Sequence, residues 1–286
     1  MTASKFVAAC AGMRSGRDPV ANRDAAVALI REAAGLGAHY VQTPEMTSLV
    51  DRGRASLFEK VGPEETDITL AGLREVAREK GVVVHVGSIA VRAGDKIANR
   101  AFVIDREGEI TARYDKVHLF DVDLPNGESW RESATYTGGD KAVLAETPWG
   151  LLGLTICYDV RFPALYRALA EGGASVLSAP ACFTRQTGEA HWHVLHRARA
   201  IETGSFMISA AQGGKHEDGR ETFGHSVIVD PWGRVLADGT AEPGLVMAEI
   251  DLSLVADARA RIPALKHGRP FTVEVARAEA RLAAAE

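Results

Sequence analysis

The chain has 286 residues, 46% of them hydrophobic and 25% charged, a composition typical of one large globular domain, and its net charge of −5 gives no electrostatic basis for binding nucleic acid or an anionic membrane. Apolar runs stay well short of the roughly 18 residues of a membrane span, and the N-terminus lacks the pattern of a signal peptide. Since the three cysteines are too few for a disulfide framework and too scattered for zinc, we expect a cytoplasmic protein without metal or cofactor.

The first part of the chain alternates between strands and helices. Hydrophobic runs predict the strands, and small or aliphatic residues recurring at 3.6-residue spacing predict the helices. Asp67 is a suitable N-cap for the second helix, and Glu45 follows the end of the second strand. In order, the predicted elements are a strand over 5–11, a helix over 22–36, a strand over 39–42, a helix over 67–80 and a strand over 82–89.

The middle of the chain is predicted to be an antiparallel meander. Three strand-like segments are joined by short turns rich in Gly and Asp, at 89–92, 97–104 and 109–114. Lys116 follows the last of them, where a lysine usually faces solvent. The next segment, 121–140, is irregular and contains Glu128 and Glu132. Loops of this length in a compact domain are usually functional or disordered.

The second half returns to alternating elements around Cys157. Residues 151–156 predict a strand buried on both faces, so Cys157 is expected at a strand end, where a lone cysteine is more often a small buried hydrophobe than a nucleophile. No repeat or linker interrupts the chain, which predicts one domain. The other predicted elements are strands over 142–146, 175–179, 206–211, 225–230 and 245–250, and helices over 163–172, 189–202, 252–261 and 274–286.

The histidines of the helix over 189–202 do not form a metal motif. His193 and His196 share one helix face, but His191 points about 200° away from His193. Since no carboxylate or cysteine completes a ligand set at standard spacing, a metal site is not predicted. A Cys-His protease is not predicted either, because no histidine follows a strand end as a base would.

Three reactive side chains follow the ends of predicted central strands, and together they make chemical sense. Glu45 can take the thiol proton of Cys157 and later pass it to a leaving amine. The positive charge of Lys116 favours the thiolate and stabilises an oxyanion on a carbonyl carbon. The backbone N–H of Tyr158 can be the second oxyanion donor.

These residues lie in three motifs that resemble those of the nitrilase, or carbon–nitrogen hydrolase, superfamily. Residues 42–45 (QTPE) resemble the glutamate motif, residues 114–120 (YDKVHLF) the lysine motif, and residues 153–163 (GLTICYDVRFP) the cysteine motif. The resemblance implies a catalytic triad of Glu45, Lys116 and Cys157.

The same resemblance carries further expectations. It implies an α/β fold, a four-layer α-β-β-α sandwich of two mixed sheets, and a homodimer or higher homo-oligomer formed through helices beside the active site. Leu165 and Leu169 offer one candidate surface. The sequence around Glu132 matches the motif of a second glutamate that supports the lysine, so Glu132 is chosen over Glu128. The hydrolase domain would span 1–271, with 272–286 as a helical C-terminal extension.

Within the superfamily, the chain most resembles the amidases that cleave deaminated glutathione. The resemblance implies hydrolysis of a small carboxylate-bearing amide through a thioester. The alternatives are a related omega-amidase, a carbamoyl or nitrile hydrolase, and a catalytically silent binding protein on the same fold. Two departures matter: Glu189 replaces a usual proline, and Gly213 replaces a usual cysteine. The matching stretches are 188–192 (GEAHW), 197–203 (RARAIET), 210–214 (AAQGG) and 224–233 (GHSVIVDPWG).

A substrate with carboxylates needs cationic or N–H donors. Arg185 follows the strand over 175–179 on a loop with Phe183 and Thr184, a mixture suited to a pocket wall. With Tyr158, these are the predicted substrate-binding residues. Arg161 is a further candidate, although a guanidinium so close to Asp159 is more often part of a structural ion pair.

Overall fold

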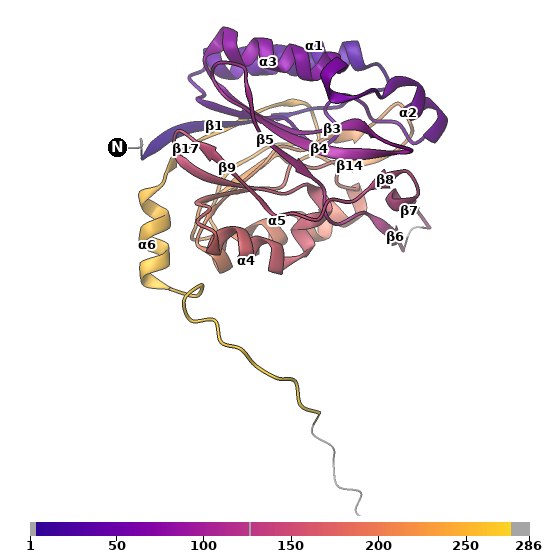
Figure 1. Cartoon of the computed structure of the whole chain (residues 1–286). Coiled ribbons are helices and arrows are strands. Elements are labelled where there is room, and N and C mark those ends of the chain that lie inside the picture. Colours follow the sequence, from indigo (N-terminus) through magenta and orange to yellow (C-terminus); the bar gives the residue numbers. More distant parts are fainter. Residues whose placement is uncertain (1–3, 126, 276–286) are drawn as a thin grey trace, which may run out of the picture.

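Two β-sheets lie face to face between two layers of helices (Figure 1). The structure is a computed structural model, and it describes residues 4–125 and 127–275. Helices α1 (Pro19–Gly35) and α3 (Ile68–Lys80) cover the outer face of one sheet, and α4 (Pro163–Glu171) and α5 (Arg185–Thr203) cover the other. The predicted α-β-β-α sandwich is therefore confirmed.

The first sheet has seven strands. Its central strands β1, β2 and β3 run parallel, while β4, β5 and β17 extend it in antiparallel fashion and β8 adds to β4. Along the sheet the strands are β17 (Gly244–Asp251), β1 (Lys5–Gly12), β2 (Tyr40–Gln42), β3 (Val83–Ala93), β4 (Lys96–Ile104) and β5 (Ile110–Asp115), with β8 at Tyr136–Thr137.

The second sheet has six strands and repeats this plan. Its central strands β10, β11 and β12 are parallel, and antiparallel strands flank them on both sides. In sheet order these are β16 (Val235–Asp238), β15 (Val227–Val229), β12 (Phe206–Ser209), β11 (Val176–Ser178), β10 (Gly150–Leu154) and β9 (Val143–Thr147). Two small hairpins lie outside both sheets, β6 (Asp121–Asp123) with β7 (Ser129–Arg131), and β13 (Gly213–Lys215) with β14 (Glu221–Phe223).

Strand β1 shows why the central strands read as continuous apolar runs. Ala8 and Cys10 point into the core between the two sheets, whereas Ala9 and Ala11 point into the core under α1 and α3. All four side chains are fully buried. Because a strand alternates its side chains between two faces, a strand covered on both faces needs apolar residues at every position.

The helix ends follow local sequence signals. The carboxylate of Asp67 accepts a hydrogen bond from the N–H of Leu70 at the start of α3, as predicted, and Gly81 ends that helix in the left-handed conformation. Two further helices are α2 (Arg54–Lys60), which was not predicted, and α6 (Ser253–Arg261), which was. None of the helices in the described part of the chain is long and apolar enough to cross a membrane.

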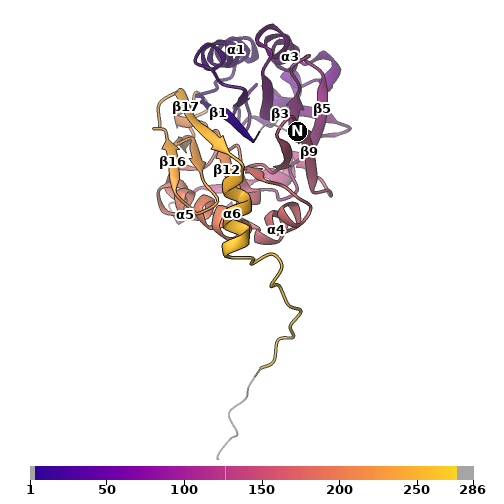
Figure 2. The ribbon, with the colours of Figure 1, turned by 90° about the vertical axis from the view of Figure 1, so that its left-hand side faces the viewer.

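Two predicted segments differ from the structure or lie partly outside it. The irregular stretch over 121–140 contains the β6–β7 hairpin, the 3-10 turn η2 (Glu132–Ala134) and β8. After α6 the chain leads away from the layers (Figure 2), and residues 272–275 are extended without helix. The helix predicted over 274–286 lies, apart from its first two residues, outside the described residues. The proposed boundary at residue 271 stays a prediction.

Candidate active site

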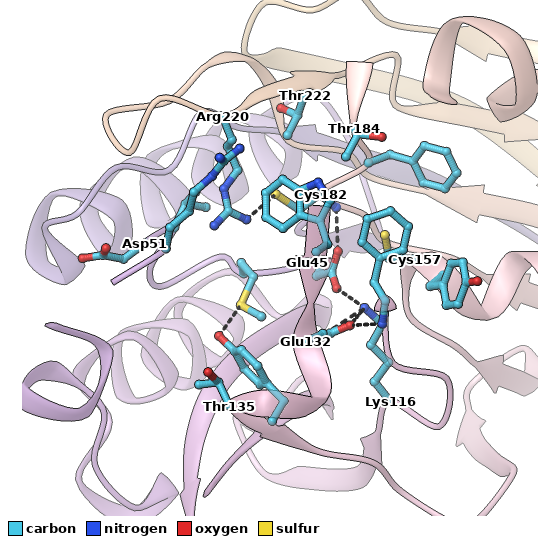
Figure 3. A pocket seen from close by; sticks show the side chains of 18 of the residues that line it. Glu45, Asp51, Lys116, Glu132, Thr135, Cys157, Cys182, Thr184, Arg220 and Thr222 are labelled. Carbon is cyan, nitrogen blue, oxygen red and sulfur yellow. Dashed lines mark hydrogen bonds and ion pairs between the residues drawn. The ribbon is translucent and has the colours of Figure 1, made fainter. Parts of the chain in front are cut away.

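The three reactive residues predicted from the sequence lie together at the strand ends of both sheets. Glu45 follows β2 and Lys116 follows β5 of the first sheet, whereas Cys157 follows β10 of the second. Figure 3 shows their side chains around one cavity. The two sheets thus bring a carboxylate, an ammonium group and a thiol to one place.

Glu45 is buried and uses both of its carboxylate oxygens. Oε1 accepts a hydrogen bond from Lys116 Nζ at 2.9 Å, and Oε2 accepts one from the backbone N–H of Cys182 at 2.7 Å. The thiol of Cys157 lies beside this carboxylate and interacts with it. Burial opposes ionisation of Glu45, but the charge of Lys116 and these hydrogen bonds outweigh it and lower the pKa of the carboxyl. Glu45 is therefore an ionised base beside a thiol.

Lys116 is held between two carboxylates. Its Nζ lies 2.9 Å from Glu45 Oε1 and 2.9 Å from Glu132 Oε2, and only 2% of its side chain is exposed. Burial would lower the pKa of Lys116, but the negative charges of Glu132 and Glu45 raise it well above its usual range. The structure brings Glu132 to Lys116, whereas Glu128 contacts the indole N–H of Trp130.

Asn99 ties the two carboxylates together and was missed by the sequence analysis. It lies in the middle of β4, fully buried, and its Nδ2 donates to Glu45 Oε1 at 2.8 Å and to Glu132 Oε1 at 3.2 Å. An amide in an otherwise apolar strand is a signal for a buried polar partner. Asn99 and Lys116 together fix the separation of two negative side chains that would otherwise repel.

Cys157 lies at the apex of a sharp turn between β10 and the 3-10 turn η3 (Cys157–Arg161). Its φ is 49°, a left-handed conformation that is costly for a residue with a side chain, and its N–H donates to the carbonyl of Pro180 at 3.0 Å. The N–H of Tyr158 is in the first turn of η3, where backbone donors lack partners within the helix. The turn therefore presents a thiol and a free donor side by side.

The thiol of Cys157 is neutral at rest, which differs from the expected thiolate. Burial raises its pKa well above the usual range, and the negative charge of Glu45 raises it further, against the opposing charge of Lys116. Lys116 does favour the thiolate, as predicted, but its charge is already balanced by two glutamates. A nucleophilic role for this thiol would require loss of its proton, and Glu45 is the carboxylate beside it.

Asp159 connects the lysine segment to the cysteine turn. This fully buried carboxylate accepts hydrogen bonds from the Tyr114 hydroxyl at 2.7 Å, from the His118 backbone N–H at 3.0 Å and from the Ile156 N–H at 2.9 Å. The ion pair expected between Asp159 and Arg161 is absent from the described residues, where Arg161 instead contacts His191. Asp159 thereby fixes Lys116 and Cys157 relative to each other across two sheets.

The cavity beside these residues has a volume of about 290 Å³. Of the predicted substrate-binding residues, Tyr158, Phe183 and Thr184 line it. The structure does not bring Arg185 to its wall, because Arg185 is exposed and forms ion pairs with Glu189 at 3.0 Å and Glu221 at 3.2 Å. Arg185 was predicted to lie in a loop, but it is the first residue of α5.

Three other arginines line the cavity, and none was predicted as a substrate-binding residue. Arg131 forms an ion pair with Asp123. Arg52 precedes α2 and Arg220 precedes β14, and both guanidinium groups lie against the ring of Trp130 from β7. Because these three residues come from widely separated parts of the sequence, no local pattern could group them. Their shared position became visible only through the fold.

The two departures from the related amidases lie away from the cavity wall. Glu189 is exposed on α5 and pairs with Arg185. Gly213 is buried, and a Cβ there would come within 2.3 Å of the carbonyl oxygen of Ala241, so the local backbone requires glycine. Neither residue lines the cavity, so neither departure is in direct contact with the space a substrate would occupy.

One group of side chains in the described residues could hold a metal ion, and it lies outside this cavity. His193, His225 and Asp238 place their ligand atoms within 4.8 Å of one another. His193 comes from α5 and Asp238 from β16, so sequence spacing could not reveal the group. In the structure Asp238 accepts a hydrogen bond from each histidine, at 2.9 and 3.2 Å.

Comparison with known proteins agrees with this geometry. The Carbon-nitrogen hydrolase family profile matches residues 7–260. The chain is 40% identical over 238 residues to "Deaminated glutathione amidase" of Yersinia enterocolitica, covering 82% of each protein.

Two solved structures share the fold closely. The C. elegans NitFhit protein superposes with a TM-score of 0.87 at 34% identity, over 94% of this chain and 66% of that one. An amidase from Nesterenkonia sp. AN1, solved as a mutant with acrylamide added at its active-site cysteine, superposes with a TM-score of 0.75 at 27% identity, over 90% of this chain and 98% of that one. The chain thus belongs to the carbon–nitrogen hydrolase family of the nitrilase superfamily.

Proposed function

We propose that this chain is an amidase that hydrolyses a small carboxylate-bearing amide, deaminated glutathione, through a thioester on Cys157. The observation that carries the proposal is the buried network in which Glu45 accepts a hydrogen bond from Lys116 and lies beside the Cys157 thiol in one cavity. The name of the Yersinia relative supports the substrate. The adduct at the active-site cysteine of the Nesterenkonia amidase supports the nucleophile.

In the first half of the reaction, Cys157 is acylated. Glu45 takes the thiol proton while Sγ attacks the amide carbonyl carbon, since the resting thiol is neutral. The oxyanion that forms is stabilised by Lys116 Nζ and by the N–H of Tyr158. As the C–N bond breaks, Glu45 passes its proton to the leaving nitrogen, and the amine departs from a thioester.

In the second half, water releases the acyl group. Glu45 is again ionised, so it can take a proton from a water molecule that attacks the thioester carbonyl. Collapse of this second tetrahedral intermediate breaks the C–S bond, and Glu45 returns its proton to the sulfur. For deaminated glutathione the products are α-ketoglutarate and cysteinylglycine, and the resting thiol is restored.

Glu132 and Asn99 act by positioning the reacting groups. Glu132 accepts hydrogen bonds from Lys116 Nζ, and Asn99 donates to both carboxylates. Tyr158, Phe183 and Thr184 line the space beside the thiol and are proposed to contact the substrate. Since the groups are fixed before substrate arrives, little reorganisation accompanies the chemical step.

The proposal is tested by the substrate preference. Purified protein is assayed with deaminated glutathione, with α-ketoglutaramate, with an uncharged amide, with a carbamoyl compound and with a nitrile, and kcat/KM is measured by ammonia or amine release. We expect deaminated glutathione to give the highest kcat/KM. Preference for α-ketoglutaramate would move the protein to the omega-amidases.

A catalytically silent binding protein is the alternative from another class. It would release no amine from any of these compounds and would show no acyl adduct on Cys157 by mass spectrometry. Thiol labelling alone does not distinguish the two, because the resting Cys157 of the proposed enzyme is itself a neutral, weakly reactive thiol.

We also propose that two chains pair through the exposed face of α5. The expected surface on α4 is unsuitable, because Leu169 is buried in the core of its own chain. On α5, Val194 and Ile201 are two turns apart and are 68% and 52% exposed. Trp232, 53% exposed, is in a turn that Arg197 joins to α5 through the carbonyl of Gly233. Exposed apolar groups that lie together mark interaction surfaces.

Light scattering at micromolar concentration tests this assembly. The wild type is expected to be a dimer, and the double variant Val194→Glu/Ile201→Glu a monomer. Leu36→Glu, which charges an exposed leucine after α1, is the control and should leave the dimer intact. A monomeric wild type would contradict the proposal.

A further inference from the structure

The charges on the cavity wall are not evenly paired. Two of the lining carboxylates, Glu45 and Glu132, share the single cation Lys116, which leaves one excess negative charge at the reacting end. Among the other described lining residues, Asp51, Arg131, Arg220 and Glu221 each have an opposite partner at the cavity margin. Arg52 is the remaining lining cation, and within the described chain no carboxylate pairs with it.

Arg52 is nevertheless held in place. Its guanidinium carbon lies 4.3 Å from the centre of the Trp130 ring, a distance at which a cation is attracted to the face of an aromatic ring. The indole N–H of Trp130 donates to Glu128 at 3.3 Å, which orients the ring. A planar guanidinium supported in this way keeps its N–H donors available for a ligand.

Arg220 reaches the same ring and is positioned more firmly. Its Nε and Nη2 both lie 2.8 Å from Asp218 Oδ2, while Nη1 points to the sulfur of Cys182 at 3.9 Å. The guanidinium carbon is 5.1 Å from the Trp130 ring centre, and 15% of the side chain is exposed. One donor edge is thus occupied by Asp218, and the other lies at the cavity (Figure 3).

Two guanidinium groups against one indole repel each other unless an anion lies near both, and Asp218 balances only one of them. We infer that Arg52 and Arg220, supported by Trp130, form a binding site for a carboxylate of the substrate. This inference rests on the proposed function and names the part of the cavity that selects its substrate class. Charge-assisted, forked hydrogen bonds are the usual means by which arginine recognises a carboxylate.

The same charge distribution orients the substrate. The excess negative charge around Lys116 repels a carboxylate from Cys157, whereas the arginine pair (Arg52 and Arg220) attracts it. An amide with a carboxylate at one end is therefore drawn in with its carboxylate at the arginines and its neutral amide at the thiol. In Figure 3, Cys182 lies between Arg220 and Cys157, so the two positions belong to one continuous cavity.

The test pairs changes in the enzyme with changes in the substrate. Deaminated glutathione carries one carboxylate on its acyl half and one on its glycine. Two analogues neutralise them separately: the glycine carboxamide, and 4-oxopentanoyl-cysteinylglycine, in which a methyl group replaces the acyl-half carboxylate. kcat and KM are measured for each compound with wild type, Arg52→Ala, Arg52→Lys and Arg220→Gln.

With deaminated glutathione, Arg52→Ala is expected to raise KM about 10- to 100-fold with little change in kcat, the usual cost of one hydrogen bond to a charged group. Arg52→Lys should recover part of this loss, because it keeps the charge but not the fork. Arg54→Ala is the matched control. Arg54 also contacts an aromatic ring, that of Phe58 at 5.1 Å, but it does not line the cavity. The Arg54→Ala variant should therefore keep the kcat and KM of the wild type.

The analogues identify which carboxylate is bound. One of the two analogues should have a raised KM already with the wild type, and Arg52→Ala should not raise that KM further. That analogue lacks the carboxylate that the arginine pair binds. Either analogue behaving so supports the site. If Arg52→Ala instead raises KM by the same factor for all three compounds, the arginine contacts no carboxylate and the inference is wrong.

Failure of the proposed function is a separate result. If wild type does not cleave deaminated glutathione, the kcat/KM ratio between a carboxylate-bearing amide and its carboxamide is measured on whichever amide of the panel is cleaved. A ratio that collapses toward one in Arg52→Ala still supports the carboxylate site. A ratio that Arg52→Ala leaves unchanged overturns it, whatever the substrate.

Discussion

At one end of the cavity the charged side chains are mostly buried and are paired, whereas at the other end a guanidinium is exposed and lacks a carboxylate partner within the described chain. Glu45, Lys116 and Glu132 exchange their hydrogen bonds with one another before any ligand is present. Arg52 has only the face of Trp130. In the proposed mechanism, the reacting groups are therefore already fixed by the fold, whereas the recognising group completes its contacts only with a ligand.

The comparison predicts that changes at the two ends affect different kinetic constants. A change at the reacting end removes stabilisation of the transition state and lowers kcat, whereas a change at the arginine end removes binding and raises KM. The predictions below act on the reacting end, from the largest expected effect to the smallest.

Replacing the nucleophile should have the largest effect. Cys157→Ala removes the only atom that can form the thioester, so turnover should fall on the order of 10⁴-fold or more. Mass spectrometry should find an acyl adduct on Cys157 of the wild type with a slow substrate. Cys10→Ala, far from the cavity in β1, is the control and should stay active. An adduct on another residue, or an active Cys157→Ala protein, would contradict the proposed mechanism.

Removing the charge of Lys116 should have the next largest effect on turnover. Lys116→Gln loses an oxyanion donor, which typically lowers kcat on the order of 100- to 1000-fold. It also leaves Glu45 and Glu132 as buried carboxylates without a cation between them, so the pKa of Glu45 should rise. The acid limb of the pH–kcat/KM profile should then move to higher pH. Near-normal turnover by a variant with an unchanged circular dichroism spectrum would refute the role of Lys116.

Asn99 offers a test of positioning alone. Asn99→Leu keeps the volume of the side chain but removes both of its hydrogen bonds to carboxylates, and we expect kcat to fall about 10- to 100-fold. KM should hardly change, because Asn99 lies behind the carboxylates and does not line the cavity. A raised KM with an unchanged kcat would place Asn99 in substrate binding instead.

The pH dependence of the wild type should be broad. The pKa of Glu45 is lowered from 4.5, so the base is ionised above that value and activity should fall only as the pH drops below it. The pKa values of Cys157 and Lys116 are raised above 9.0 and 10.5, so neither group changes its charge in the neutral range. kcat/KM should therefore be flat between about pH 5 and pH 9. A bell-shaped profile centred near neutrality would contradict these protonation states.

The elements with strong local signals were predictable from the sequence. The helix over 67–80 has its cap at Asp67 and its stop at Gly81, and the structure places α3 at Ile68–Lys80. The strand before Cys157 and the motif around it are continuous in sequence, so the position of Cys157 at a strand end beside the cavity could be predicted. Helix α2 was missed, since its seven residues bury only Leu57 and show little helical periodicity.

The parts of the site that could not be predicted depend on distant contacts. Asn99 is a polar residue in an apolar strand, which signals a buried partner but does not name it. Arg52 and Arg220 are far apart in sequence, and in the fold each lies against the ring of Trp130. Arg185 was predicted instead of them because it is close to the strand end in sequence. The protonation of Cys157 likewise depends on how deeply the fold buries it, a property of the whole molecule.

The neutral thiol bears on how this protein withstands oxidants. Peroxides react with thiolates much faster than with neutral thiols. Burial also raises the pKa of Cys10 to about 12 and of Cys182 to about 11, so none of the three thiols is a ready target at neutral pH. We therefore expect Cys157, the proposed nucleophile, to be oxidised slowly by peroxide while no substrate is bound.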